Sequence, residues 1–186
     1  MKVYAITYDY KSLHCLSQDC YENDLIDFSI KLPRNHAESY HDMWHPPDFY
    51  HEKDNPILDT FFASFFKAKF TFYDELFADQ EMIQLLQSYG EILPLPLSDS
   101  DKKAYVYHCM KTIKNEKEAL LVHAGPEKHV LEKTMSKEKI PSRGLFLIYP
   151  SLYTVENEEL GVESNFKMLY DARRYTGLEF VEMKLV

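Results

Sequence analysis

The order of strand-like and helix-like segments is the feature that most constrains the fold of this chain. Alternating patterns and β-forming residues predict strands at residues 2–8, 25–32, 91–97, 103–110, 119–123, 128–134, 144–149 and 178–185. Helical periodicity is clear in only two places, so strands and helices do not alternate regularly. A doubly wound parallel sheet requires that alternation. The sequence therefore predicts an α+β fold with a largely antiparallel sheet.

The two predicted helices flank a β-rich middle region. The first is expected to end at Gly90 and has apolar side chains at i, i+3, i+4 and i+7, namely Met82, Leu85, Leu86 and Tyr89. The second is expected to start with Ser164 as its N-cap, to stop before Gly177 and to carry Phe166, Leu169, Ala172 and Arg173. The phenylalanine-rich run at residues 57–72 fits either a buried pair of strands or a helix.

The length of 186 residues predicts one domain that spans residues 1–186. A chain of this size buries roughly 70% of its extended surface on folding, so its stability requires neither disulfides nor a structural metal. The five glycines are isolated from one another, and no tract has the composition of a linker. Residues 20–56 contain four prolines and are expected to form a long irregular loop region near the N-terminus.

The distribution of apolar residues disfavours membrane insertion and secretion. The longest strongly apolar stretch, residues 57–66, contains Asp59 and is shorter than the about 20 residues of a transmembrane helix. The first residues lack the continuous apolar region of a signal peptide. Three cysteines, Cys15, Cys20 and Cys109, cannot all pair, which is typical of a reducing compartment. We therefore expect a cytoplasmic protein.

Acidic residues are concentrated in the first half of the chain. Residues 1–93 contain 16 acidic and 7 basic side chains and residues 94–186 contain 14 of each, so the net charge of −9 comes from the first half. Proteins that bind duplex nucleic acid are normally basic, so direct nucleic-acid binding is not expected. One-sided acidity favours fast association with a basic partner, although solubility alone would also account for it.

Motifs of the common catalytic and nucleotide-binding sites are missing from the sequence. A phosphate-binding loop needs clustered glycines, yet the two closest, Gly161 and Gly177, are 16 positions apart. His108 and Cys109 are neighbours in a predicted strand, where successive side chains point to opposite faces. Cys109 is therefore expected to be a core residue rather than a nucleophile with His108 as its base.

Histidine and cysteine are enriched in the first 51 residues, where a metal site has to be considered. These residues are His14, Cys15, Cys20, His36, His41, His45 and His51. His41 and His45 have the spacing of two ligands on a helix, but Pro46 disfavours helical backbone at His45. Because the spacing matches no zinc pattern, we predict neither a metal nor a cofactor; a small metal-dependent enzyme is the alternative.

Three short motifs occur in a recognisable order along the chain. They are Trp44–Pro47 (WHPP), Gly90–Leu95 (GEILPL) and Tyr175–Phe180 (YTGLEF). In the order and spacing of these motifs the chain resembles the divergent bacterial immunity proteins found beside polymorphic toxins, including those of contact-dependent growth inhibition. The second motif also predicts a strand with Pro94 at a sheet edge or bulge, and the third a strand with Leu178 and Phe180 on one face.

The resemblance implies an inhibitor that is not an enzyme. Such a protein binds the C-terminal domain of a cognate toxin and blocks its active site or substrate path. The motif positions would then specify the fold, and the toxin-facing residues would lie elsewhere. An adaptor that uses its acidic half for another host protein is a further alternative.

The acidity of the first half suggests how such an inhibitor could bind. If the toxin is a nuclease with a basic cleft, a carboxylate-rich patch could occupy that cleft in place of phosphates. The candidates combine acidic side chains and an aromatic residue in an expected loop; they are Asp42, Trp44, Asp48, Glu52 and Asp54. Trp44 could serve a partner as a hot spot or anchor the loop to the core, and anchoring is favoured.

Overall fold

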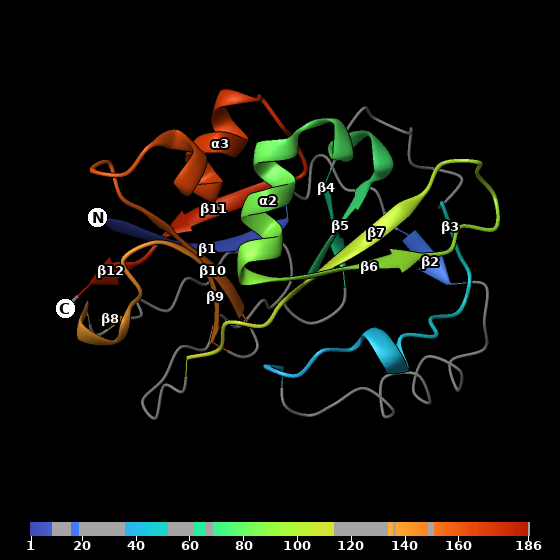
Figure 1. The fold of residues 1–186 in the computed structure, drawn as a ribbon, viewed down its shortest axis with the longest axis horizontal. Coiled ribbons are helices and arrows are strands. Elements are labelled where there is room, and N and C mark those ends of the chain that lie inside the picture. The colour runs from blue at the N-terminus through green and yellow to red at the C-terminus, as the bar shows by residue number, and fades with distance from the viewer. Residues whose placement is uncertain are drawn as a thin grey trace, which may run out of the picture.

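Two four-stranded antiparallel sheets form the framework of the protein (Figure 1). The computed structural model describes residues 1–8, 16–18, 36–51, 62–65, 69–113, 134–135, 137–148 and 151–185. Within these residues, two α-helices and several short 3-10 turns accompany the sheets. The predicted α+β fold with largely antiparallel strands is confirmed.

The first sheet has the strand order β11-β1-β10-β9 and brings together distant parts of the chain. Its strands are β1 (Lys2–Tyr8), β9 (Gly144–Ile148), β10 (Ser151–Glu156) and β11 (Leu178–Glu182). Ala5 of β1 pairs with Tyr153 on one side and with Val181 on the other. The strands predicted from the sequence do not include β10, whose residues 152–155 are buried.

The second sheet has the strand order β4-β5-β7-β6. Its strands are β4 (Phe62–Phe65), β5 (Lys69–Tyr73), β6 (Gly90–Leu95) and β7 (Ala104–Cys109). Since β4 and β5 pair with each other, the described part of the phenylalanine-rich run forms strands and not a helix. β6 is an edge strand, which gives Pro94 the position expected of a residue without a backbone N–H.

The two faces of the second sheet pack against different parts of the molecule. In β7, Tyr105, Tyr107 and Cys109 contact the main hydrophobic core, which contains residues of both sheets and both helices. Ala104 and Val106 belong to a separate cluster on the opposite face. This division follows the two-residue period of a strand.

Helix α2 (Gln80–Tyr89) turns its apolar side to the main core, as its spacing predicts. The Asp79 side chain caps its N-terminus by accepting a hydrogen bond from the Met82 amide at 3.1 Å. Gly90 follows the helix directly, so the predicted end of the helix is confirmed. The backbone of Gly90 runs so close to β7 that a Cβ atom would lie 2.1 Å from the carbonyl oxygen of His108.

Helix α3 (Phe166–Ala172) starts later than the sequence predicts. Ser164 belongs to the preceding 3-10 turn η4 (Val162–Ser164), and Asn165 is the N-cap, so the prediction of Ser164 as the cap is wrong. The amide group of Asn165 instead fixes the preceding loop, because it donates to the carbonyl of Gly161 at 2.8 Å.

Helix α3 also ends before Gly177. Its last helical residue is Ala172, and Arg173 is the C-cap rather than a helical residue. Arg174 then adopts a left-handed φ of 57°, which stops the helix. Leu178 and Phe180, on the strand that follows, both pack on the main core, as the third sequence motif predicts.

The remaining strands form two short pairs. β2 (Leu16–Gln18) pairs with β3 (Phe49–His51), and β8 (Thr134–Met135) pairs in parallel with β12 (Lys184–Leu185). The predicted strands at residues 25–32 and 119–123, and most of the one at 128–134, lie outside the described residues. In the described part of the chain, no helix combines the length and the apolar character that a membrane crossing requires.

Residues 36–49, here called the strap, lie along the edge strand β6 (Figure 1). The strap is part of the irregular region predicted near the N-terminus and contains the 3-10 turn η1 (His41–Met43). It covers the face of the second sheet that points away from the main core. The cluster formed there contains Tyr40, Trp44 and Phe49 of the strap together with Tyr73, Leu93, Leu95, Ala104 and Val106 of the sheet region.

Candidate functional site

Trp44 anchors the strap to β6. Its side chain is only 7% exposed, and its indole N–H donates a hydrogen bond to the carbonyl oxygen of Pro94 at 2.5 Å. Further along the strap, the amide of Phe49 donates a hydrogen bond to the carbonyl of Pro96. The carbonyl of Phe49 in turn accepts a hydrogen bond from the amide of Ser98. The anchoring role favoured by the sequence is confirmed, and this burial leaves little of the indole ring for a partner to contact.

Glu91 holds the other end of the strap. Its carboxylate accepts hydrogen bonds from the Ser39 hydroxyl and the Tyr40 amide, both at 2.6 Å, and from Nδ1 of His108 at 2.9 Å. Burial alone would raise the pKa of Glu91, but these hydrogen bonds outweigh burial and hold the pKa below its ordinary value of 4.5. The strap is therefore bound to an ionised carboxylate at neutral pH.

Lys69, His108 and Glu91 form a row of ionisable side chains across three neighbouring strands, here called the ionisable row. The strand registers place Lys69 and Glu91 on either side of His108. Lys69 is 8% exposed and His108 is 1% exposed. The Tyr40 ring stacks on the His108 ring with 3.8 Å between centroids, and Nζ of Lys69 lies 5.2 Å from the centroid of the Tyr40 ring. The strap thus covers charged groups as well as an apolar surface.

The second ring nitrogen of His108 is buried. No described residue gives Nε2 of His108 a hydrogen-bond partner. The His36 ring lies edge-on to His108 at 6.5 Å, and Nδ1 of His36 lies 2.9 Å from the Tyr40 hydroxyl. The Glu91–His108 pair has the form of a carboxylate that orients an imidazole base, but Tyr40 covers the imidazole. Through the hydrogen bonds of Glu91 to Ser39 and Tyr40, the pair positions the strap.

The structure places the sequence-predicted site residues on the strap as far as it describes them. Asp42 and Asp48 are exposed, whereas Trp44 between them is buried. Glu52 and Asp54 lie outside the described residues. Three of the five candidates therefore share one segment, and their role in partner binding stays a prediction.

The predicted histidine-rich region shows no metal site in its described part. Among the described residues, no three His, Cys, Asp or Glu side chains gather as possible metal ligands. His41 and His45 are exposed. His14, Cys15 and Cys20 lie outside the described residues, and the metal-dependent enzyme remains the alternative prediction.

Cys109 is a core residue, as the sequence predicts. Its side chain is 1% exposed in the main core. Burial raises the pKa of its thiol to about 11, so the thiol is protonated at neutral pH. His108 lies on the other face of the strand against Tyr40 and is therefore not available as a base for Cys109.

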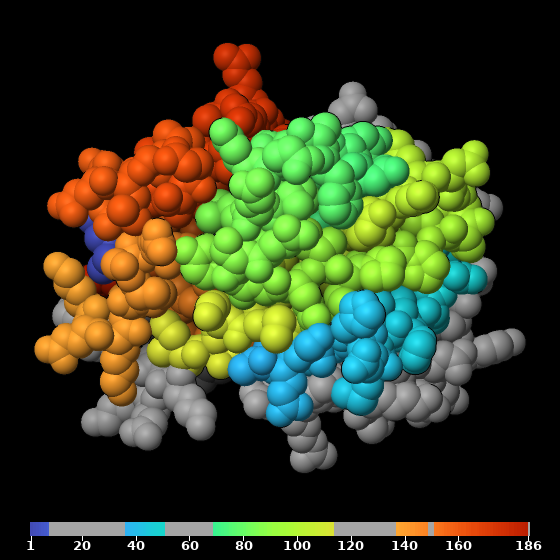
Figure 2. Space-filling model, in the orientation of Figure 1, coloured from blue at the N-terminus to red at the C-terminus, as the bar shows by residue number. Residues whose placement is uncertain are grey.

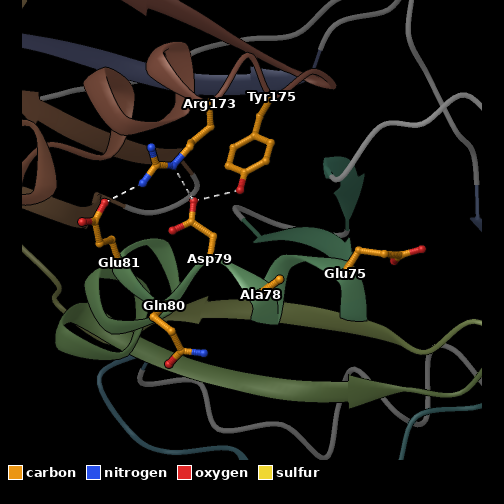
Figure 3. A pocket seen from close by; sticks show the side chains of 7 residues that line it. All are labelled: Glu75, Ala78, Asp79, Gln80, Glu81, Arg173 and Tyr175. Atoms are coloured by element: carbon orange, nitrogen blue, oxygen red, sulfur yellow. Dashed lines mark hydrogen bonds and ion pairs between the residues drawn. The ribbon is translucent and has the colours of Figure 1, made fainter.

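A second charged cluster lies where helix α2 begins and helix α3 ends (Figure 3). Asp79 accepts hydrogen bonds from the Tyr175 hydroxyl at 2.9 Å and from Nε of Arg173 at 3.2 Å. Arg173 also donates to Glu81 at 2.7 Å. These side chains border an open hollow of about 550 Å³ that is lined by Glu75, Ala78, Asp79, Gln80, Glu81, Arg173 and Tyr175. The cluster links α2 to the segment that leads into β11.

The pKa shifts of Asp79 and Tyr175 come from burial and from hydrogen bonds within the cluster. Burial would raise the pKa of Asp79, but hydrogen bonds from Met82, Tyr175 and Arg173 hold it below its ordinary value of 3.8. Burial raises the pKa of Tyr175, and its hydrogen bond to Asp79 raises it further. Both carboxylate oxygens of Asp79 have donors within the chain, so the group serves the fold.

The sequence patterns did not predict the ionisable row or the Asp79 junction. Two signals were nevertheless present, because Glu91 and Tyr175 lie within the second and third motifs. Asp79 also stands directly before an apolar helical period, which is a typical N-cap position. Their partners, His108 and Arg173, become neighbours only through the strand register and the helix packing.

The acidic excess belongs to one part of the fold. Residues 36–51 and 69–103 carry ten acidic and three basic side chains, whereas the other described residues carry eight and nine. The exposed acidic residues of the first group are Glu38, Asp42, Asp48, Glu75, Glu81, Asp99 and Asp101. Their segments, the strap, the η2–α2 region (η2, Asp74–Ala78) and the β6–β7 turn, contribute to one face (Figure 2). We call this the acidic face.

Burial raises the pKa of Tyr73, beside the β6–β7 turn, to about 12, and the carboxylates of Asp99 and Glu75 add to the rise. The carboxylates of the acidic face therefore act on the buried Tyr73 hydroxyl, although burial is the larger cause of the rise. Lys102 pairs with Glu75 at 3.0 Å, so the face also contains a cation.

Comparisons of this chain with protein-family models, curated proteins and solved structures gave no match.

Proposed function

We propose that this protein is a cytoplasmic immunity protein that binds a basic bacterial toxin domain and blocks its active site. The protein acts by binding and not by catalysis, and it needs no cofactor. The observation that carries the proposal is the one-sided charge: the acidic excess lies on the second sheet, α2 and the strap, while the rest of the described chain is balanced. The motif resemblance supports the same class of protein.

The strap supports this proposal because it presents acidic side chains on an anchored segment. Asp42 is exposed within η1, between the buried residues Tyr40 and Trp44. Met43 is also 41% exposed, so an apolar side chain is available next to the carboxylate. An anchored segment loses less conformational entropy on binding than a mobile one, and carboxylates attract a cleft built for phosphates.

The proposal is tested with the toxin domain encoded next to this chain. Both are expressed together, and we expect the cells to survive and a complex to be purified whose association rate falls with salt. The variant Asp42→Lys/Asp48→Lys is expected to weaken binding by about tenfold or more. Extending the reversal to Glu52 and Asp54 tests the remaining sequence candidates.

The matched control is Glu158→Lys/Glu159→Lys, which makes the same change of charge at exposed positions on the balanced part of the fold. We expect it to change affinity much less than the strap variant. Equal losses in both variants would attribute the effect to net charge, and unchanged affinity in the strap variant would remove the strap from the interface. No protection and no complex would contradict the proposed function.

A further inference from the structure

Besides the pairing of Phe49 with Gln18 of β2 and its backbone hydrogen bonds with Pro96 and Ser98, the strap contacts the described molecule through two chemically different sets of side chains. Trp44 and Phe49 pack in an apolar cluster that shares no buried residue with the main core. Ser39 and Tyr40 instead bind the carboxylate of Glu91. Because the apolar cluster is separate, the strap can leave the sheet while both helices and the main core stay packed.

The charged region under the strap depends on Glu91. The titratable groups that face one another there are Glu91 on β6, His108 on β7, Lys69 on β5, and Tyr40 and His36 on the strap. Glu91 is the one carboxylate in this set of described residues. It accepts three hydrogen bonds, two of them from the strap.

We propose that residues 36–49 open and close as a unit and that the negative charge of Glu91 keeps them closed. Protonation of Glu91 removes the charge that strengthens the bonds from Ser39 and the Tyr40 amide. It also removes the negative charge that faces Nδ1 of His108. The proposal concerns the protein alone and does not rest on the proposed function.

The direction of the pH dependence follows from the contacts of Glu91. Its pKa is below 4.5 in the closed state, so its contribution to closure is present at neutral pH and is lost as the pH falls through that lowered pKa. Acidification is therefore expected to open the strap. Opening exposes the ring of Trp44, the only tryptophan of the chain, so intrinsic fluorescence reports it directly.

The test uses the full-length protein and measures acrylamide quenching of Trp44 and far-UV circular dichroism between pH 7.5 and pH 3. We expect the quenching constant to rise about threefold at a higher pH than any loss of secondary structure. Quenching and circular dichroism that change together at one midpoint would overturn the proposal, because the strap would then not open separately.

Two variants assign the effect to Glu91. Glu91→Gln keeps the shape of the side chain but removes its charge, and we expect Trp44 to be quenched at pH 7.5 as strongly as in the acidified wild type. Asp42→Asn, which removes an exposed carboxylate from the same strap, is the matched control and should keep the wild-type profile. A closed strap at pH 7.5 in Glu91→Gln would overturn the role of the charge.

A milder variant covers the case in which Glu91→Gln fails to fold. Ser39→Ala removes one hydrogen bond to the carboxylate at an exposed position. It should raise the pH midpoint of Trp44 quenching by roughly half a unit, because a carboxylate with fewer donors is protonated more easily. An unchanged midpoint in Ser39→Ala would also count against the proposal.

Discussion

The indole N–H of Trp44 donates to the carbonyl oxygen of Pro94, which lies 50 positions later in the chain. This bond joins the first sequence motif to the second. Glu91, also in the second motif, binds Ser39 and Tyr40 just before the first. Tyr175 of the third motif binds Asp79. Each motif therefore supplies a residue that holds separate segments of the fold together.

The Trp44 anchor leads to a prediction about stability. Trp44→Phe retains an aromatic ring but removes the donor to Pro94, so we expect the free energy of unfolding to fall by about 1 kcal/mol. Trp44→Ala also leaves a cavity and should cost about 3 kcal/mol or more. Urea denaturation followed by circular dichroism measures both. Met43→Ala, at the exposed neighbouring position, is the control and should change the free energy of unfolding little. A loss as large as that of Trp44→Ala would contradict the anchoring role of Trp44.

Gly90 is expected to tolerate no side chain. In Gly90→Ala the new Cβ would meet the carbonyl oxygen of His108, and because that atom belongs to the backbone, β6 and β7 would have to move apart. We expect a loss of about 2 to 4 kcal/mol in the free energy of unfolding. Gly161→Ala is the matched control, because its Cβ would meet only the flexible side chain of Glu163. Equal stability of the two variants would show that β6 and β7 leave room for a Cβ atom at Gly90, against the close approach described above.

Two substitutions of Asp79 should separate its role as a helix cap from its role as an ionic partner of Arg173. Asp79→Asn keeps an N-cap acceptor but loses the charge that faces Arg173, so a loss of about 1 kcal/mol is expected. Asp79→Ala loses both roles and should cost about 2 to 3 kcal/mol. Thermal unfolding measures the difference, and Glu81→Gln, which changes only an exposed ion pair, serves as the control with little effect.

The pH dependence of the same junction has a defined sign. The pKa of Asp79 is held below 3.8, so its stabilising contribution is present above that pH and is lost as the pH falls through the lowered pKa. The wild type should therefore lose more stability than Asp79→Asn as the pH falls from 5 to 2. Parallel stability profiles in the two proteins would show that the carboxylate contributes nothing through its charge.

Cys109 should be unreactive in the folded protein. Its thiol is buried and its pKa is about 11, so little thiolate is available to a reagent such as iodoacetamide at pH 8. Peptide mass spectrometry after brief labelling is expected to find Cys109 unmodified in the native protein and modified after denaturation in urea. Rapid native labelling of Cys109 would contradict its placement in the core.

Sequence patterns predicted the elements with a strong local signal, either an apolar helical period or a run of β-forming residues. The period of helix α2, the strands β1 and β7, and the edge position of Pro94 all follow from local rules. β10 was not predicted, although Tyr153, Thr154 and Val155 are good β-formers and the equally buried β9 was predicted. Ser164 was wrongly chosen as a cap because the choice between it and Asn165 depends on the contacts of Asn165 with the preceding loop.

The candidate site was only partly predictable for a different reason. Acidic residues on an exposed loop can be read from composition, and Asp42 and Asp48 are exposed as such residues should be. The ionisable row requires three residues from three strands, and its register depends on long-range pairing. Trp44 illustrates both cases: its position marked it as unusual, but only the contact with Pro94 showed that it points inward.

The place of β1 in the first sheet has a consequence for synthesis of the protein on the ribosome. β1 is synthesised well before both of its neighbours, β10 and β11; Tyr4 and Glu156, which contact each other across this pairing, are 152 positions apart. The nascent β1 therefore has neither sheet partner until the more than 140 residues that separate it from β10 have been synthesised. Its buried residues Val3 and Ala5 remain unpaired during that time, which favours late folding and dependence on chaperones.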